Sequence, residues 1–243
     1  MQNVLVNQVT KDIQSGSSKN ISEIGFTIPG YRSYIAVTQE QKDKAYRLRH
    51  KVYSEELKWV PETADGREID EFDEHAIMVC VEDDRGEVIG TIRIIDSDHQ
   101  WMSEKYFAHT VTDGIDSIKA LSCIESSRNA VALDYRVKTL GDSGLTVFDL
   151  MLCTAMDFTW DILNREHVFV TAAPVMGVIL KRKGGAVRQV GPIVTMPDKC
   201  KIASFVLDLT ICRDTYSMYH SCMELDNACS ANLAHGTSIA NRA

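Results

Sequence analysis

Two stretches of the sequence combine acidic and basic side chains in patterns that suit acid–base chemistry. In "CIESSRNAV" (123–131), Glu125 and Arg128 interrupt a stretch that is otherwise suited to a buried strand. A buried, unpaired carboxylate has a raised pKa and can act as a general base near neutral pH. The alternative is an ion pair that fastens the sheet to a helix. Because residues three apart point to opposite faces of a strand, we expect a bulge at Ser126–Ser127 to bring the two side chains closer.

The second stretch is the acidic loop "EIDEFDEH" (68–75), which holds Asp70 and Asp73 among three glutamates. The simplest interpretation of such a run is a solvated loop. A calcium site of the EF-hand type is not expected, since the glycine and the terminal glutamate of that motif are absent. A third interpretation is a pocket for a cationic substrate, because carboxylates bind ammonium groups and can accept their protons.

Two arginines and a tryptophan accompany these acids. Arg93 lies in the apolar run "GTIRIID" (90–96), where it either snorkels to the surface or serves a site. Arg49 lies in a helical pattern whose polar face could simply be solvated. Trp59 stands beside the polar loop, a position that argues against a core tryptophan.

As a set, these residues resemble the signature of the acyl-homoserine-lactone (autoinducer) synthases. The matching positions are Arg49, Tyr53, Trp59, Asp70, Asp73, Arg93, Phe107, Glu125, Ser126 and Arg128. The resemblance covers residues 45 to 130 best and extends more weakly to about 210. Two positions depart from the pattern: Tyr53 replaces the usual Phe, and Ser126 replaces a larger apolar residue.

The resemblance implies a reaction and a set of roles. That family transfers an acyl chain from the phosphopantetheine arm of acyl carrier protein to the amine of S-adenosylmethionine, and lactone closure then expels methylthioadenosine. The sequence offers Glu125 as general base, Asp70 and Asp73 as the amine site, and Trp59 as the adenosine wall. Backbone N–H groups at the expected bulge would bind the oxyanion. No metal and no cofactor beyond the substrate S-adenosylmethionine is expected.

The acyl chain and the carrier protein need surfaces of their own. An apolar helix and the strand that contains Thr171 are expected to line the acyl tunnel, although a core role is the default there. The basic run of Lys181, Arg182 and Lys183 could dock the acidic carrier protein, or could simply complement a helix C-terminus. The turn "LGDSGLTVF" (140–148) weakly resembles the coenzyme A loop of acyltransferases, and a degenerate loop would suit a carrier protein.

Two other functions stay open at this point. An N-acyl amino acid synthase would use a free amino acid, such as tyrosine, as the small-molecule amine acceptor. A non-catalytic module of the same fold would bind acyl carrier protein or a small molecule without turnover. Trp59 and the spacing of Asp70 and Asp73 favour the synthase that uses S-adenosylmethionine.

The bulk composition excludes several classes of protein. The chain has 243 residues with 44% hydrophobic and 25% charged content, which is typical of a globular protein. Its net charge of −8 argues against nucleic-acid binding. Seven cysteines without metal-ligand spacing predict reduced thiols in a cytoplasmic protein. No apolar run is long enough for a membrane span, and the N-terminus lacks a signal-peptide core.

These residues must be positioned by a regular series of elements. Hydrophobic periodicity predicts helices over 39–57, 144–163 and 174–184. Strands are predicted over 34–38, 76–82, 87–96, 123–131, 167–173, 186–194 and 201–209, and Asp83–Gly86 has the composition of a hairpin turn.

This order predicts an α/β fold of the α+β type. A hairpin between central strands excludes a purely parallel sheet, so we expect a mixed β-sheet with helices on both faces. The order resembles the three-layer sandwich of GNAT acyltransferases. We expect a flexible N-terminal arm over 1–30, the acyltransferase domain over 31–212, and a C-terminal extension over 213–243 with one short helix.

Overall fold

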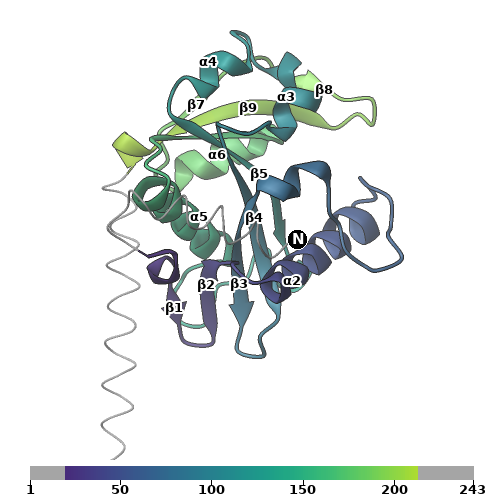
Figure 1. Ribbon diagram of the computed structural model, residues 1–243, viewed down its shortest axis with the longest axis vertical. Coiled ribbons are helices and arrows are strands. Elements are labelled where there is room, and N and C mark those ends of the chain that lie inside the picture. The colour runs from purple at the N-terminus through teal and green to yellow at the C-terminus, as the bar shows by residue number, and fades with distance from the viewer. Residues whose placement is uncertain (1–19, 213–243) are drawn as a thin grey trace, which may run out of the picture.

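The computed structural model describes residues 20–212, which form one mixed sheet with helices on both faces (Figure 1). The strands are β1 (Thr27–Ile28), β2 (Tyr31–Ile35), β3 (Ile77–Asp83), β4 (Val88–Asp96), β5 (Cys123–Val131), β6 (His167–Ala172), β7 (Val187–Gln189), β8 (Val194–Thr195) and β9 (Lys201–Asp208). Their order in the sheet is β1-β2-β3-β4-β5-β6-β9-β7, and β8 pairs with β9. The mixed sheet and the α/β class are confirmed.

The helices divide between long elements that cover the sheet and short ones in the loops. The α-helices are α2 (Gln39–Arg49), α3 (Met102–Tyr106), α4 (Ile115–Lys119), α5 (Val147–Asp157) and α6 (Pro174–Arg182). The π-helices η2 (His50–Glu56) and η6 (Phe158–Ile162) continue α2 and α5, and the 3-10 turns are η1 (Ile21–Glu23), η3 (Glu71–His75), η4 (Ala108–Thr110) and η5 (Leu133–Tyr135).

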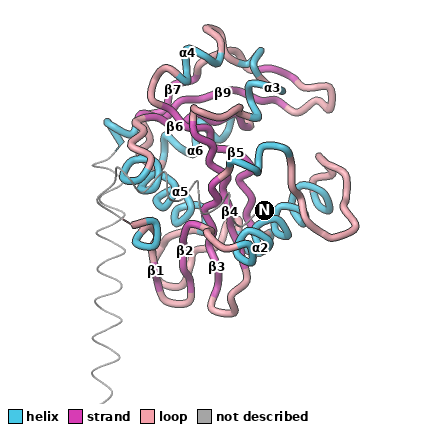
Figure 2. Tube along the Cα trace, viewed as in Figure 1, coloured by secondary structure: helices cyan, strands magenta, loops and turns pink. Residues whose placement is uncertain are grey.

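Alternation along β3 separates the two faces of the sheet. Val79 and Val81 belong to the apolar cluster that contains most of α5, whereas Met78 and Cys80 belong to the cluster that contains α2. This is the period-two pattern of a strand that is buried on both sides. The three-layer arrangement follows, and Figure 2 shows α2 beside β3 in one half and α3 and α4 with β7 and β9 in the other.

The sheet opens in its centre, between β5 and β6. These strands pair in parallel only from Cys123–His167 to Glu125–Phe169. Beyond Glu125, β5 continues with β4 on one side, while β6 continues with β9. Where two neighbouring strands separate, the backbone N–H and C=O groups on their facing edges no longer pair with each other. Glu125 therefore stands at the point where the sheet divides.

Several sequence predictions need correction. Residues 20–30 were expected in a flexible arm, yet they form η1 and β1 and bury Ile21, Ile24 and Ile28. Burial of these three apolar side chains stabilises the folded segment, whereas a loose arm would leave them in contact with water. The strand predicted over 186–194 is two short strands, β7 and β8. The first 19 residues and the extension from 213 onward, with its expected helix, lie outside the described residues.

Candidate active site

A buried network of alternating charges joins α2 to the acidic loop. The guanidinium of Arg49 donates two hydrogen bonds to Asp73, 2.7 Å from Nη1 to Oδ1 and 2.9 Å from Nη2 to Oδ2. The same guanidinium also pairs with Glu68. The side chains of Arg49, Asp73 and Glu68 are 1%, 3% and 6% exposed. Buried charges are stable only when they are paired and hydrogen-bonded, and this geometry meets that condition.

Arg93 of β4 and Arg128 of β5 complete the network. Arg93 Nη1 contacts Asp70 and lies 3.3 Å from Asp73 Oδ1. Arg128 Nε lies 3.0 Å from Glu68 Oε1, and Arg128 Nη2 lies 2.9 Å from Asp70 Oδ2. The network thus contains three arginines and three carboxylates, and it carries no net charge. Glu68 and Asp73 are therefore not part of a solvated loop, whereas Glu71 and Glu74 are exposed.

The spacing of Asp70 and Asp73 also has a local cause. Asp70 is the N-cap of η3, and its Oδ1 accepts a hydrogen bond of 3.0 Å from the Phe72 N–H. Asp73 Oδ2 in turn accepts the Asp70 N–H at 2.8 Å. This reciprocal pair is a capping box, which needs acceptors three residues apart. The same two carboxylates therefore shape the turn and pair with the arginines.

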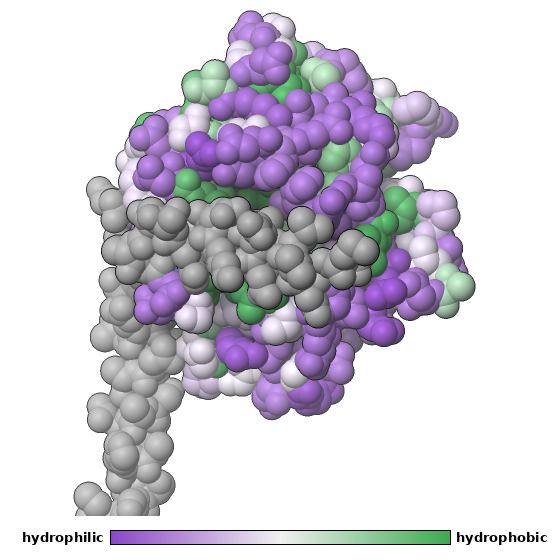
Figure 3. All heavy atoms as spheres, in the orientation of Figure 1, coloured by the Kyte–Doolittle hydropathy of each residue, from purple (hydrophilic) through white to green (hydrophobic). Residues whose placement is uncertain are grey.

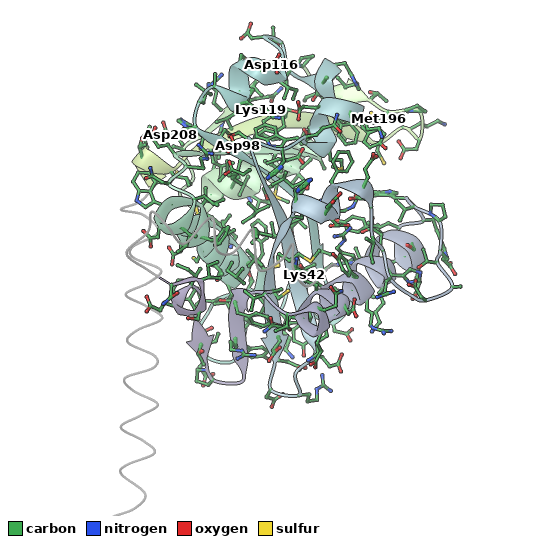
Figure 4. The ribbon with its side chains drawn as sticks, in the orientation of Figure 1. Lys42, Asp98, Asp116, Lys119, Met196 and Asp208 are labelled. Carbon is green, nitrogen blue, oxygen red and sulfur yellow. The ribbon has the colours of Figure 1, made fainter. Side chains whose placement is uncertain are left out.

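The network shifts the pKa values of its members and neighbours. Burial by itself raises the pKa of Asp73, but hydrogen bonds and charge from Arg49, with Arg93, hold it below its ordinary value. Lys42 lies on α2 in the same half of the molecule (Figure 4), and burial lowers its pKa against the opposing charge of Asp73. Asp73 is therefore ionised at neutral pH.

Glu125 lies apart from this network. Its side chain is 0% exposed, and its carboxyl oxygens accept backbone hydrogen bonds from Met102 at 3.0 Å and Ser103 at 2.8 Å. These two amides belong to the first turn of α3. Burial raises the pKa of Glu125, and the hydrogen bonds from Ser103 and Met102 offset part of that rise. The arrangement gives a carboxyl that is held in place and is able to accept a proton.

The structure places the bulge of β5 after Ser127 and excludes the alternative of a Glu125–Arg128 ion pair. Ser127 stands opposite Arg93, and Ala130 stands opposite Thr91, so two residues of β5 face Ile92. Those residues are 128 and 129, and Arg128 has a positive φ of 50°. The bulge therefore follows Ser127 rather than containing Ser126. It turns Arg128 toward Glu68 and Asp70, so the Glu125–Arg128 pair does not form.

Two aromatic residues border the network. The Tyr53 hydroxyl donates to the Asn129 carbonyl at 2.7 Å, and the Arg128 guanidinium lies 5.5 Å from the Tyr53 ring centre. The hydroxyl, which a phenylalanine would lack, therefore ties η2 to the bulge. Trp59 packs at 5.9 Å and 31° against Tyr53 but is 59% exposed. This exposure excludes a core position for Trp59, and its role as a stacking wall for a ligand stays a prediction.

The remaining predicted binding residues lie on both sides of the opening. Ser126 is half-buried on β5 opposite Ile94, and Phe107 is half-buried at the end of α3. Thr171 of β6 contacts the Ser103 hydroxyl at 3.2 Å. The structure therefore brings Thr171 close to the residue that holds Glu125, while Trp59 and the network stand on the α2 side.

Of the three basic residues at the end of α6, one is paired with an acid and two are exposed. Lys183 forms an ion pair with Asp149, which lies in the first turn of α5. Lys181 and Arg182 are exposed. Because Lys183 is already paired, the expected docking surface is reduced to Lys181 and Arg182.

Sequence reasoning missed four contributors to this site. Glu68 was noted only as a neighbour of the paired aspartates, although three arginines against two aspartates left one charge unbalanced. Ser127 accepts a hydrogen bond of 3.0 Å from Arg93 Nε, and it lies inside the motif already recognised. Met102 and Ser103 act through backbone amides, so their side-chain types carried no signal.

Comparison with known proteins decides the family. A model of the autoinducer synthases matches residues 33–212. The chain belongs to the autoinducer synthase family. It is therefore an acyltransferase of the acyl-homoserine-lactone synthase type.

Individual relatives agree with this assignment. An acyl-homoserine-lactone synthase of Vibrio anguillarum is 29% identical over 154 residues, which is 63% of this chain and 77% of the relative. TofI, solved with an inhibitor and MTA, shares the fold with a TM-score of 0.64 at 17% identity, over 76% of this chain and 96% of TofI. BjaI, a CoA-dependent synthase solved with SAM and isopentyl-CoA, has a TM-score of 0.61 at 20% identity, over 75% of this chain and 82% of BjaI.

Residues 20–212 contain neither a metal-binding cluster nor a membrane-spanning helix. In this part of the chain, no group of three or more His, Cys, Asp or Glu side chains could hold a metal ion. The helices described there are too short or too polar to cross a bilayer. Figure 3 shows that the face turned to the viewer is mostly hydrophilic where it is coloured.

Proposed function

We propose that this autoinducer synthase transfers a fatty acyl chain from acyl carrier protein to the amine of S-adenosylmethionine and then closes the lactone. The observation that carries the proposal is the place of Glu125. Its carboxyl is buried and held by two amides where β5 and β6 separate. A base at that point lies beside backbone groups that are free of strand pairing, so proton transfer and oxyanion binding share one location.

The chemistry assigns one task to each group. Glu125, directly or through one water, takes a proton from the ammonium, and the free amine attacks the thioester carbonyl. The new C–N bond forms, the C–S bond breaks, and the phosphopantetheine thiol leaves with a proton. Amide N–H groups of β5 beyond Glu125 stabilise the oxyanion. The carboxylate of the acylated product then attacks its own γ-carbon and expels methylthioadenosine, which completes the lactone.

The acceptor is proposed to bind between Trp59 and the charged network. Asp70 and Arg128 are its most exposed members, with side-chain exposures of 19% and 18%. Asp70 attracts the cationic substrate, Arg128 attracts a carboxylate, and the exposed face of Trp59 stacks on adenine. Asp73 acts at one remove, because its side chain is only 3% exposed. A tyrosine acceptor would also place its ring on Trp59, so the identity of the product distinguishes the two acceptors.

Acyl carrier protein is the proposed donor because the start of α5 is already occupied. Thr146 caps this helix, and the Asp149 carboxylate accepts the Thr146 N–H at 2.8 Å. The preceding turn closes with a hydrogen bond of 2.7 Å between Leu140 N and Leu145 O. A coenzyme A diphosphate placed there would compete with the Asp149 carboxylate for the amides at the start of α5, whereas a carrier-protein arm has no diphosphate at that position. The exposed Lys181 and Arg182 offer a surface to the acidic carrier.

One assay tests both the reaction and the base. Purified enzyme is given acyl carrier protein loaded with a fatty acyl chain and S-adenosylmethionine, and mass spectrometry identifies the products. An acyl-homoserine lactone with methylthioadenosine supports the proposal. If the enzyme instead makes an acyl amino acid when it is given a mixture of amino acids, the acceptor is a free amino acid. If it makes no product, the protein is a binding module.

The variant Glu125→Gln is the decisive change. We expect kcat to fall by about 10²–10⁴-fold, which is the usual contribution of general base catalysis. Glu166→Gln, at an exposed glutamate next to β6, is the matched control and should keep wild-type kcat. If Glu125→Gln lowers the melting temperature but its folded fraction keeps normal kcat, Glu125 serves only as a cap for α3.

A further inference from the structure

Trp101 is a fully buried tryptophan that directly precedes the two amides bound to Glu125. The peptide bond between Trp101 and Met102 carries the first of these amides, and the second is that of Ser103. Trp101 and Glu125 are both 0% exposed. Backbone N–H groups hold a carboxylate in one place only if the chain that carries them is itself fixed. The contacts that fix Trp101 therefore bear on Glu125.

The indole ring fastens this point of the chain to both strands that flank Glu125. Its Nε1 donates a hydrogen bond of 3.1 Å to the Asp96 carbonyl at the end of β4, and its face stacks on Phe169 of β6 with ring centres 5.5 Å apart. Phe169 is the residue opposite Glu125 in β6. Asp96 directly follows Ile95, which is opposite Glu125 in β4. We call these two contacts of the ring the Trp101 anchor.

The backbone of Trp101 has a separate support. Its N–H donates to the carboxylate of Glu104, which forms an ion pair with Lys119 of α4. The Lys119 ammonium also lies 5.0 Å from the indole centroid, and Figure 4 labels this lysine beside α4. Ring and backbone are thus held by different groups, and both supports act on the turn of chain that presents the amides to Glu125.

We propose that Trp101 is a positioning residue for Glu125, which holds the Met102 and Ser103 amides against the carboxyl through the Trp101 anchor. The proposal rests on the proposed role of Glu125 as the general base. Trp101 acts through the two amides rather than through contact with the reacting atoms. Because amides that donate to a carboxylate stabilise its ionised form, the anchor affects both the place of the carboxyl and its basicity.

The charges around Glu125 come from other elements. Arg93 of β4 is the charged side chain that favours the ionised carboxyl. Titratable groups on the flanking elements have partners of their own: Asp96 pairs with Arg165, Glu104 with Lys119, and the His167 ring with the Leu121 carbonyl. Substitution of the indole removes none of these charges, so a change in the titration of Glu125 would report on the amides.

Two substitutions separate the contacts of the ring. Trp101→Phe keeps a ring against Phe169 but removes the hydrogen bond to Asp96, and Trp101→Leu removes both contacts. Ile28→Ala is the matched control for lost burial, because Ile28 is 2% exposed and lies on β1 at the outer edge of the sheet. It should lower the melting temperature and leave the kinetic constants of the folded enzyme unchanged.

The expected result is a change in kcat without a change in acceptor binding. For Trp101→Leu, the acid limb of kcat/KM should move up by about one pH unit, because loosened amides no longer favour the ionised carboxyl. Its kcat should fall by about 10–10²-fold, as expected when a reacting group is misplaced by about 1 Å, while KM for S-adenosylmethionine stays the same. Trp101→Phe should show the same changes to a smaller degree.

Infrared titration of the Glu125 carboxyl band, identified by its loss in Glu125→Gln, measures the pKa shift without turnover. If Trp101→Leu lowers the melting temperature as Ile28→Ala does but leaves the limb and the band in place, Trp101 only fills the core and the proposal is overturned. A shifted band in Trp101→Leu, combined with normal kcat in Glu125→Gln, would support the anchor and refute only the base role.

Glu104 provides a second test should Trp101→Leu not fold. Its side chain is 26% exposed, so Glu104→Ala frees the Trp101 N–H without opening the core. We expect the carboxyl band of Glu125 to shift in the same direction. Glu104→Gln keeps an acceptor for the N–H and should restore the wild-type titration. An unchanged band in Glu104→Ala and in Trp101→Phe also overturns the proposal.

Discussion

Arg49 and Asp73 form a doubly hydrogen-bonded ion pair in the interior of the protein, although they lie 24 residues apart in the sequence. Their side chains are 1% and 3% exposed. The pair joins the last turn of α2 to the acidic loop, and it does so in the same network that includes Arg93 and Arg128. A contact that orders the proposed acceptor side of the site is thus also part of the core.

The first prediction concerns the stability that this pair supplies. Arg49→Met removes the cation and leaves Asp73 and Glu68 buried without their main partner. We expect a loss of about 3–5 kcal/mol in the free energy of unfolding, measured by urea denaturation. The exposed pair between Arg136 and Glu56 is the control, and Arg136→Met should change stability little. Equal stability of Arg49→Met and wild type would contradict a structural role for the pair.

The depressed pKa of Asp73 predicts how stability depends on acid. Its folded-state pKa lies below its unfolded value of about 3.9, so the unfolded state binds more protons as the pH falls between the two. The stabilisation is complete above pH 4 and is lost as the pH falls through the folded pKa. We expect Asp73→Asn to be less stable at pH 7 and to show a shallower decline below pH 4. Parallel curves for the two proteins would show that Asp73 is not linked to acid unfolding.

The raised pKa of Glu125 predicts the acid limb of catalysis. A base works only when it is ionised, so kcat/KM should fall as the pH drops through the pKa of Glu125 in the free enzyme. Because burial raises that pKa, the midpoint should lie above about 4.3, the ordinary value for glutamate. A pH–rate profile with a stable buffer series measures it. A limb centred at or below the ordinary value would mean that another group accepts the proton.

Gly90 predicts a tight contact between β4 and α5. A Cβ at this position would lie 2.3 Å from Val147 Cγ1 and 2.7 Å from Met151 Sδ. We expect Gly90→Ala to lower the free energy of unfolding by about 1–3 kcal/mol, as overpacking of a core usually does. The loss caused by Gly90→Ala should be smaller in a protein that also carries Val147→Ala and Met151→Ala. This thermodynamic cycle tests the contact itself. If the free-energy changes of the substitutions are fully additive, the strain caused by Gly90→Ala does not come from Val147 and Met151.

The exposed basic residues at the end of α6 predict how tightly the enzyme binds its acyl donor. Replacing Lys181 and Arg182 with Glu should raise KM for acylated carrier protein at low salt, while KM for the amine acceptor stays the same. Added salt should raise the wild-type KM and reduce the difference between the two proteins, because screening weakens contacts between exposed charges. Lys199→Glu, at an exposed lysine before β9, serves as the control. An unchanged carrier KM in the double variant leaves only a helix-end role for these residues.

The residue types of the sequence determined the elements and much of the chemistry. The short apolar runs of β3 and β4, joined by a turn, and the long apolar run of α5 predicted strands and a buried helix, because run length and turn residues reflect local backbone geometry. The spacing of Asp70 and Asp73 likewise predicted a pair that acts together, and the turn of η3 places both in one capping box. Composition and spacing were sufficient there because the partners lie within one turn of chain.

Only the tertiary structure decided which charges meet. From the sequence, Arg128 had Glu125 as its nearest candidate within β5, whereas the bulge after Ser127 directs it to Glu68 and Asp70, about sixty residues away in the chain. Glu125 in turn finds the amides of α3, which are invisible in side-chain types. A strand register sets the direction of each side chain, and one added residue reverses it. Pairings across the fold therefore depended on the register between β4 and β5, which no local pattern encodes.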